Sequence, residues 1–156
     1  ELLEAYGQSF GLTATSFRFF NVYGPRQDPS SAYSGVISIF ADRYRAGQPV
    51  KVNGDGRQSR DFVYIADLTT AVARAATDDS LPGGVYNLCT GRATTLLDLI
   101  EILSADYPDV GAPEFGPERV GDIRHSLGDP SAARERLGIV NQTPFDKGIQ
   151  ALLESL

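Results

Sequence analysis

Residues 13–27 read TATSFRFFNVYGPRQ and change in character halfway along. The segment Thr13 to Phe20 is rich in β-branched and aromatic residues, which is typical of a strand. Asn21 to Gly35 contains two prolines and no apolar period, so we predict a long loop, and such loops in compact domains are usually functional or disordered. Apolar residues at helical spacing then predict a helix from about Val36 to Ala46. A strand, a long loop and a helix in succession indicate an α/β fold.

Helices and strands continue to alternate on both sides of this segment. The pattern predicts further strands at 50–52, 61–65 and 85–88. It predicts helices over 1–10, after a cap at Asp67, from a capping box at Thr95 to about Ala105, and in two short segments that follow Asp129 and Thr143. Asp55-Gly56 is a hairpin-type turn signal. We see no internal repeat and no interior linker, so residues 1–156 are predicted to form a single α/β unit.

Composition excludes several classes of protein. The chain has 156 residues, 14 Lys+Arg against 20 Asp+Glu, a net charge of -6, one Cys and one His. One Cys and one His make neither a disulfide scaffold nor the usual zinc sites, so we expect no metal. The acidic balance argues against nucleic-acid binding, and no apolar run approaches a membrane span. The absence of Met and the first residue Glu1 suggest a segment of a longer protein.

Two short motifs suggest sites that their context does not support. Residues 7–11 (GQSFG) match the GxSxG elbow of α/β-hydrolases, but a helix precedes Ser9 and a strand follows, which reverses the required order. We interpret the segment as a helix end with Gly11 as its cap. Residues 54–59 (GDGRQS) lack the third glycine and the following helix of a dinucleotide loop, and are interpreted as a turn. His125, the only candidate base, has no special setting.

Arg60 is more informative, because it directly precedes the apolar run FVYI and is therefore expected to be partly buried. A buried guanidinium needs an anionic partner. The structural alternative is an ion pair with Asp61, Asp67 or Asp122. The functional alternative is bidentate recognition of a phosphate group. The residues alone leave both alternatives open.

Four motifs together resemble one family, the extended short-chain dehydrogenases/reductases that act as NAD-dependent nucleotide-sugar epimerases and dehydratases. The motifs are RFFNVYGPRQ (18–27), GDGRQSRDFVYIAD (54–67), YNLCTG (86–91) and RVGDI (119–123). Cys89 stands where the family usually has Gly, and Val120 stands where it has Pro. The motifs occur in the family's order, and the resemblance covers essentially the whole chain.

The resemblance implies the carboxy-terminal part of an extended Rossmann-type fold, namely the last Rossmann elements plus a small α/β substrate-binding lobe. In the family, the amino-terminal part carries the GxxGxxG loop for NAD, a catalytic Ser or Thr and the YxxxK pair. We therefore expect no catalytic residue in this segment and expect the segment alone to be inactive. NAD is the implied cofactor.

The resemblance also implies a set of substrate-binding positions: Asn21, Gly35, Val36, Lys51, Asn53, Arg60, Arg119 and Asp122. Asn21 matches a contact to the diphosphate–sugar region, while Arg60 and Arg119 match diphosphate arginines. Gly35 and Val36 begin a helix that lines the base pocket. The backbone groups of Lys51 and Asn53 match contacts to uracil, and Asp122 matches a ribose-binding carboxylate. Phe20 matches a residue near the nicotinamide.

The implied function is NAD-dependent 4-epimerisation of a UDP-hexose, such as UDP-glucose, UDP-galactose or an N-acetyl analogue, through a 4-keto intermediate. The alternatives are a dehydratase, decarboxylase or reductase of the same family, or a catalytically silent module that binds sugar nucleotides. The resemblance further implies a cytoplasmic homodimer when the protein is full length. It implies neither a nucleic-acid nor a membrane partner.

Overall fold

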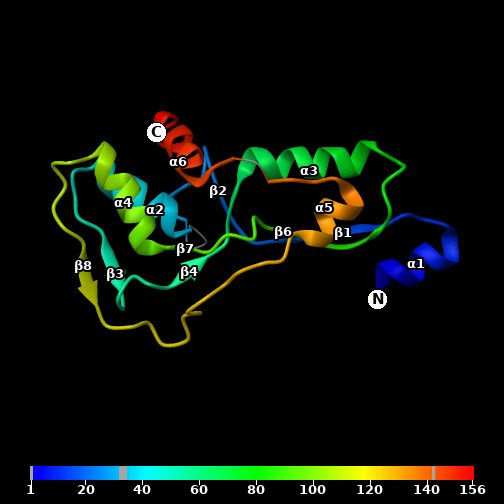
Figure 1. Cartoon of the computed structure of the whole chain (residues 1–156), viewed down its shortest axis with the longest axis horizontal. Helices are drawn as coiled ribbons and strands as arrows, with labels where there is room; N and C mark the ends of the chain where they lie inside the picture. Colours follow the sequence, from blue (N-terminus) through cyan, green and yellow to red (C-terminus); the bar gives the residue numbers. More distant parts are fainter. Residues whose placement is uncertain (1, 32–34, 142) are drawn as a thin grey trace.

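The structure, a computed structural model, describes residues 2–31, 35–141 and 143–156. It has the predicted α/β class (Figure 1). The elements follow in the order α1 (Leu2–Phe10), β1 (Thr15–Phe19), β2 (Asn21–Tyr23), α2 (Val36–Arg45), β3 (Lys51–Asn53), β4 (Ser59–Arg60), β5 (Phe62–Tyr64), α3 (Ile65–Thr77), β6 (Gly84–Leu88), β7 (Thr94–Thr95), α4 (Leu96–Asp106), β8 (Glu114–Gly116), α5 (Ser131–Leu137) and α6 (Phe145–Glu154).

Strand pairing is mostly parallel and joins segments that are distant in sequence. β1 pairs with β6, β2 with β5 and β3 with β8, all in parallel, whereas β4 and β7 are antiparallel. The predicted hairpin at Asp55 is therefore wrong, because β3 before the turn pairs with β8 and β4 after the turn pairs with β7. The turn itself is present, and Gly54 and Gly56 adopt the positive φ angles that glycine tolerates.

Two local predictions need correction. The loop predicted from Asn21 begins with strand β2, which the sequence pattern missed because its partner β5 lies far along the chain; residues 32–34 of that loop lie outside the described residues. Helix α3 begins at Ile65 with Tyr64 as its N-cap, so Asp67 is not the cap. The Asp67 carboxylate instead accepts hydrogen bonds from the backbone N–H and the hydroxyl of Thr143.

Other local predictions are confirmed. Thr95 and Asp98 form the capping box at the start of α4, with both reciprocal hydrogen bonds present. Gly138 ends α5 in the left-handed conformation. Gly11, directly after α1, has a φ of 66°, as expected for a glycine at a helix end. The predicted helix at the amino terminus is observed from Leu2, and Glu1 lies outside the described residues.

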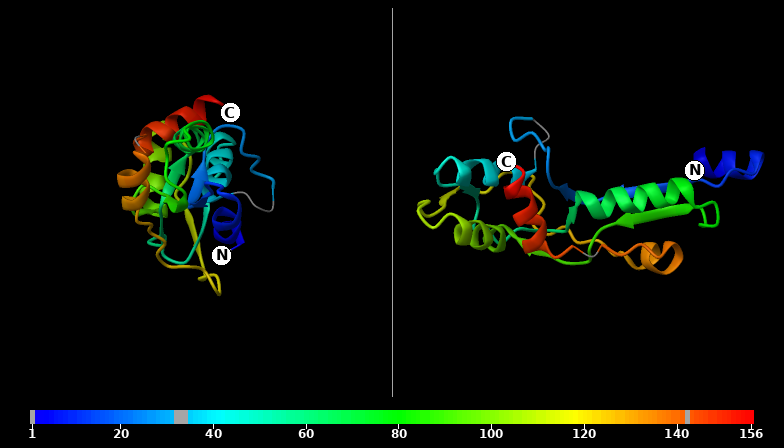
Figure 2. Two further views of the ribbon diagram at one scale, coloured as in Figure 1. Left: turned by 90° about the vertical axis from the view of Figure 1, so that its right-hand side faces the viewer. Right: turned by 90° about the horizontal axis from the view of Figure 1, so that it is seen from above.

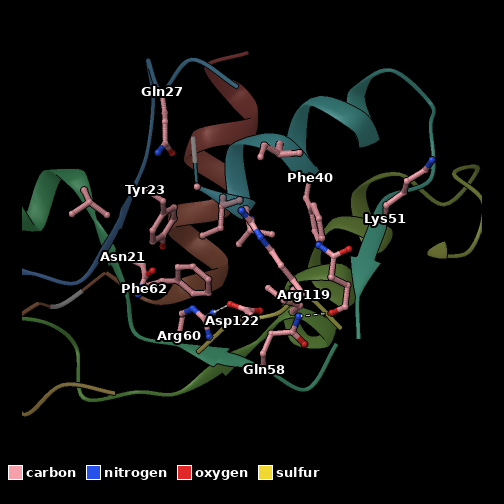
Figure 3. Close-up of a pocket in the computed structure, with 17 residues that line it drawn as sticks. Asn21, Tyr23, Gln27, Phe40, Lys51, Gln58, Arg60, Phe62, Arg119 and Asp122 are labelled. Carbon is pink, nitrogen blue, oxygen red and sulfur yellow. Dashed lines mark hydrogen bonds and ion pairs between the residues drawn. The ribbon is translucent and has the colours of Figure 1, made fainter. Parts of the chain in front are cut away.

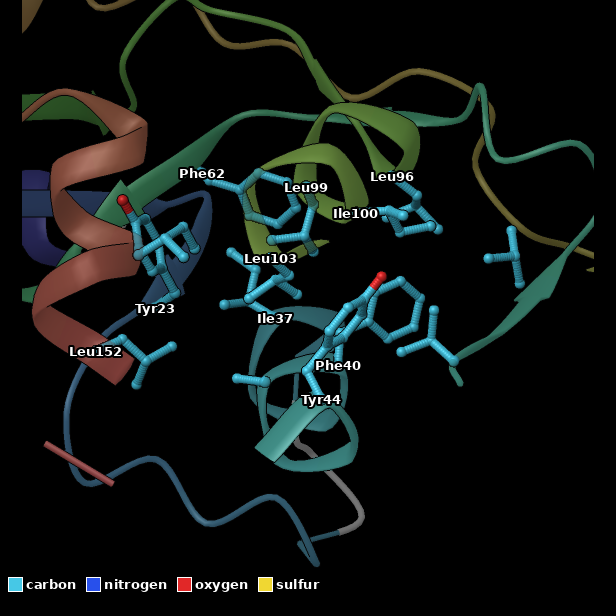
Figure 4. Close-up of a cluster of buried hydrophobic side chains, with 14 residues drawn as sticks. Tyr23, Ile37, Phe40, Tyr44, Phe62, Leu96, Leu99, Ile100, Leu103 and Leu152 are labelled. Atoms are coloured by element: carbon cyan, nitrogen blue, oxygen red, sulfur yellow. The ribbon is translucent and has the colours of Figure 1, made fainter. Parts of the chain in front are cut away.

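The buried side chains form two clusters. The first lies between helices α2, α4 and α6 and strands β3 and β5, and includes Tyr23, Phe40, Tyr44, Phe62 and Leu99 (Figure 4). The second packs α3 and α5 on β5 and β6 and is formed by Val63, Leu68, Ala71, Tyr86, Leu88, Ala133, Leu137 and Ile139. Amphipathic helices thus cover short strands in both halves of the molecule.

The molecule is elongated, with α1 at one end and β3, α4 and β8 at the other (Figure 2). Helix α1 projects from the body and leaves Leu2, Leu3, Tyr6 and Phe10 more than half exposed. None of the helices in the described ranges is both long and apolar enough to cross a bilayer.

Candidate functional site

A cavity of about 580 Å³ lies beside the first core cluster, where β2, β5, β3 and the start of α2 approach the segment after β8 (Figure 3). The substrate-binding residues predicted from the sequence all line it: Asn21, Gly35, Val36, Lys51, Asn53, Arg60, Arg119 and Asp122. They come from positions spread over most of the chain. The fold therefore brings the whole predicted set to one place.

One side of the cavity is formed by Asn21, Arg60 and Asp122. The backbone N–H and the side-chain Nδ2 of Asn21 both donate to the carbonyl of Asp61, at 3.0 and 3.1 Å, which fixes the amide and leaves its oxygen available. Arg60 donates from Nη2 to Asp122 Oδ1 at 2.7 Å and from Nη1 to the carbonyl of Ser59. The Arg60 side chain is only 17% exposed, as its sequence position predicted. Arg60 thus both forms an ion pair with Asp122 and lines the cavity.

Arg119 lies on the exposed segment that follows β8. Its guanidinium makes no hydrogen bond or ion pair with any residue in the described ranges, and Figure 3 shows it extending into the cavity. Asp122, on the same segment, neutralises Arg60. Arg119 is therefore a cation available to an incoming anion.

The opposite side is formed by the start of α2 and by β3. The first residue before the helix, Gly35, offers no side chain to cap it, so the first-turn N–H groups and the positive end of the helix dipole lie at the cavity. The Lys51 ammonium is largely exposed, 3.9 Å from Glu114. The carbonyl of Asn53 accepts a 2.8 Å hydrogen bond from Gln58 Nε2.

Several lining residues were not predicted as part of the site. Phe40, Phe62 and Leu96 supply an apolar wall, and their helical or strand spacing marked them only as core. Gln27 and Gln58 also line the cavity, and the side-chain oxygen of each is buried without a partner among the described residues. Both glutamines lie inside motifs that the sequence had singled out, which was the one available signal.

The charge in the cavity is opposite in sign to the charge of the whole chain. Lys51, Arg60 and Arg119 line it with Asp122 as the acidic counterpart, although the chain carries a net charge of -6. The electrostatic field of the whole protein would repel an anion, so recognition of an anion depends on these local groups. The arrangement suits an anionic ligand that also has an apolar or aromatic part.

The other candidate groups lie elsewhere. Ser9 is inside α1 and not in a strand-to-helix elbow, which agrees with the interpretation of its motif as a helix end. The His125 ring shares a 2.9 Å hydrogen bond with the hydroxyl of Ser59. Cys89 is fully buried, and this burial raises the pKa of its thiol to about 11, so it behaves as a small apolar residue.

Phe20 does not line the cavity. It follows β1 and packs against the second core cluster, and a Cβ added at Gly128 would lie 2.7 Å from its ring. The nicotinamide site predicted for Phe20 would therefore lie beside the second core cluster and outside the cavity. The described residues include no glycine-rich loop that would hold a dinucleotide.

Comparisons with known proteins identify the family of the chain. The model of the NAD dependent epimerase/dehydratase family matches residues 1–89. A UDP-glucose 4-epimerase from Mycolicibacterium smegmatis is 36% identical over 152 residues, which cover 97% of this chain and 48% of that protein. The chain spans about half the length of the curated relatives it matches.

Two solved structures are similar over 99% of this chain. A UDP-glucose 4-epimerase from Thermotoga maritima, solved with UDP-glucose, has a TM-score of 0.90 and 36% identity, and the match covers 49% of it. A UDP-glucose 4-epimerase from Thermus thermophilus, solved with NAD, has a TM-score of 0.81 and 36% identity, and 50% of it is covered. The fold is thus that of one part of a Rossmann-type epimerase structure.

Proposed function

Because the chain belongs to the NAD-dependent epimerase/dehydratase family, whose cofactor is NAD, we propose that its cavity binds the UDP part of a nucleotide sugar. We further propose that the full-length protein interconverts UDP-hexoses by 4-epimerisation through a 4-keto intermediate. The observation that carries the proposal is the cavity in which Arg60 and Arg119 lie at one side and the start of α2 and β3 at the other.

We assign the two sides of the cavity to the two parts of UDP. A diphosphate is recognised by guanidinium groups that donate paired hydrogen bonds, which is the role proposed for Arg60 and Arg119. In this proposal Asn21 contacts the diphosphate–sugar region and Asp122 the ribose. A planar base needs an apolar surface and a few edge hydrogen bonds, for which Val36 with Phe40 and the backbone of Lys51 and Asn53 are suited.

Local arginines can supply the required affinity in an acidic protein. Each charge-assisted hydrogen bond contributes about 1.5–3 kcal/mol. A micromolar complex corresponds to about 8 kcal/mol, so two guanidiniums could account for much of the binding of UDP. Such firm anchoring of the nucleotide would leave the sugar free to turn, as inversion at C4 requires.

This segment would therefore anchor the substrate, and we assign no proton-transferring residue to it. When bound, NAD would supply the hydride acceptor for the sugar C4. We propose that Phe20 lies near the nicotinamide. We also propose that the segment by itself is inactive and that the full-length protein is a cytoplasmic homodimer. Size-exclusion chromatography with light scattering would test the oligomeric state.

Turnover assays on the full-length protein test the function. We expect UDP-galactose to be converted to UDP-glucose with bound NAD and no net change in the NAD pool. Release of a 4-keto-6-deoxy sugar would instead identify a dehydratase. Tight UDP binding without turnover would favour the catalytically silent module, and absence of UDP binding would contradict the assignment of the cavity.

A further inference from the structure

The segment from Pro117 to Leu127, called the Arg119 loop below, has little packing of its own. Val120 is fully exposed and Ile123 is 62% exposed, so apolar contacts do not hold it in place. Yet this loop carries two cavity residues, Arg119 and Asp122. Their positions must therefore depend on polar contacts between the loop and the body.

Besides the Arg60–Asp122 ion pair in the cavity, the loop makes a second ion pair that lies outside it. Arg124 donates from both terminal nitrogens to both carboxylate oxygens of Asp55, at 2.7 Å each. This bidentate geometry fixes the orientation of both groups as well as their separation. Backbone hydrogen bonds between Ser59 and residues 124 and 126 continue the attachment. Neither Asp55 nor Arg124 lines the main cavity.

The turn that carries Asp55 is itself well defined. The Asp55 carboxylate accepts a 3.0 Å hydrogen bond from the backbone N–H of Arg57, and the Arg124 guanidinium holds the pKa of this carboxyl well below its usual range. The Arg119 loop also packs closely on the turn, because a Cβ added at Gly54 would lie 3.1 Å from Glu118 Cγ. The loop thus contacts this turn at the point where the ion pair joins them.

We infer that Asp55 and Arg124 are positioning residues, whose bidentate pair holds the Arg119 loop so that Arg119 and Asp122 meet the diphosphate and ribose of the ligand. This inference rests on the proposed function of the cavity. Exposed ion pairs add little to global stability, so the effect of this pair is local. Without the pair, a ligand must order the loop when it binds. The apparent affinity for the ligand then falls with the fraction of molecules whose loop is already in the binding-competent conformation.

The test compares UDP binding to variants of the full-length protein by titration calorimetry. Arg124→Gln and Asp55→Asn should each weaken UDP binding about 5- to 30-fold, the cost of ordering one or two long side chains. Arg57→Gln is the matched control, because it removes an exposed arginine from the same turn but leaves the pair intact; its UDP affinity should equal that of the parent. The exchange Asp55→Arg with Arg124→Asp should recover part of the lost affinity.

A purely structural role would give additive losses, so the decisive measurement is a double-mutant cycle. In an Arg119→Ala background, Arg124→Gln should weaken UDP binding by a smaller factor than it does in the parent, since only the position of Asp122 then still depends on the pair. Equal UDP affinity of the parent and Arg124→Gln, or full additivity with Arg119→Ala, would overturn the inference. Where the exchange variant does not fold, the isosteric Asp55→Asn decides. A parent protein that does not bind UDP would instead refute the proposed function, and the inference with it.

Discussion

Replacement of Arg60 by alanine is expected to weaken UDP binding strongly without unfolding the protein. The Arg60 side chain is only 17% exposed, and its guanidinium already donates one hydrogen bond to Asp122 and one to the carbonyl of Ser59. We therefore count one remaining charge-assisted bond to the diphosphate, worth about 1.5–3 kcal/mol. This corresponds to a UDP dissociation constant about 10- to 150-fold higher. The unpaired Asp122 carboxylate would add repulsion toward the ligand.

Calorimetry on the full-length protein checks this expectation with UDP and NAD in parallel. Arg60→Ala should leave NAD binding within 2-fold of the parent, because Arg60 lines the cavity that we assign to the substrate. Arg60→Lys keeps the charge but not the forked geometry and should fall between the parent and the alanine variant. A thermal unfolding midpoint close to that of the parent controls for folding. Equal UDP affinity of Arg60→Ala and a UDP-binding parent would refute the diphosphate assignment.

Three further predictions concern the fold that carries the site. Gly148→Ala should destabilise the protein in chemical denaturation, because its Cβ would collide with the buried Tyr23 hydroxyl. Overpacking costs about 1–3 kcal/mol, which equals or exceeds the gain of about 1 kcal/mol from alanine in a helix. Tyr23→Phe should recover part of that loss, and no loss in Gly148→Ala would show that the helix simply shifts. Asp61→Asn should lower the free energy of unfolding by at least about 2 kcal/mol. The buried carboxylate accepts hydrogen bonds from Thr90, Gly91 and Gly128, and an amide cannot accept all of them. An unchanged denaturation midpoint would contradict this prediction. Burial raises the pKa of the Cys89 thiol to about 11, so Cys89 should resist iodoacetamide at pH 8 and react only after denaturation. Peptide mass spectrometry would follow the labelling, and rapid labelling of the native protein would contradict the burial of Cys89.

Local signals in the sequence predicted the helices well. The capping box at Thr95 and the cap at Gly138 depend only on residues a few positions apart, and both are present. The resemblance of four motifs to one family identified residues that the fold then gathers around one cavity, including Arg60 and Arg119. The roles of these residues in binding remain predictions.

Interactions between distant segments could not be predicted in this way. Strand β2 was assigned to a loop because its three residues gain strand character only from β5. Asp67 was assigned as a cap because its partner Thr143 lies at the other end of the chain. The Arg124–Asp55 pair was missed for the same reason, since neither residue has a local pattern that names the other.

The parallel pairing of the strands has a consequence for the order in which the protein folds. Thr15 pairs with Gly84, Asn21 with Phe62 and Lys51 with Glu114. Each parallel pairing therefore closes a long loop of chain, and the entropy cost of closing it comes before the contacts that stabilise the pair. Such a topology folds slowly, because its contact order is high. The cavity needs β2, β3, β5 and the Arg119 loop together, so it forms only after these distant segments have come together. A ligand for this cavity would bind no early intermediate and would act solely by slowing the loss of the finished structure.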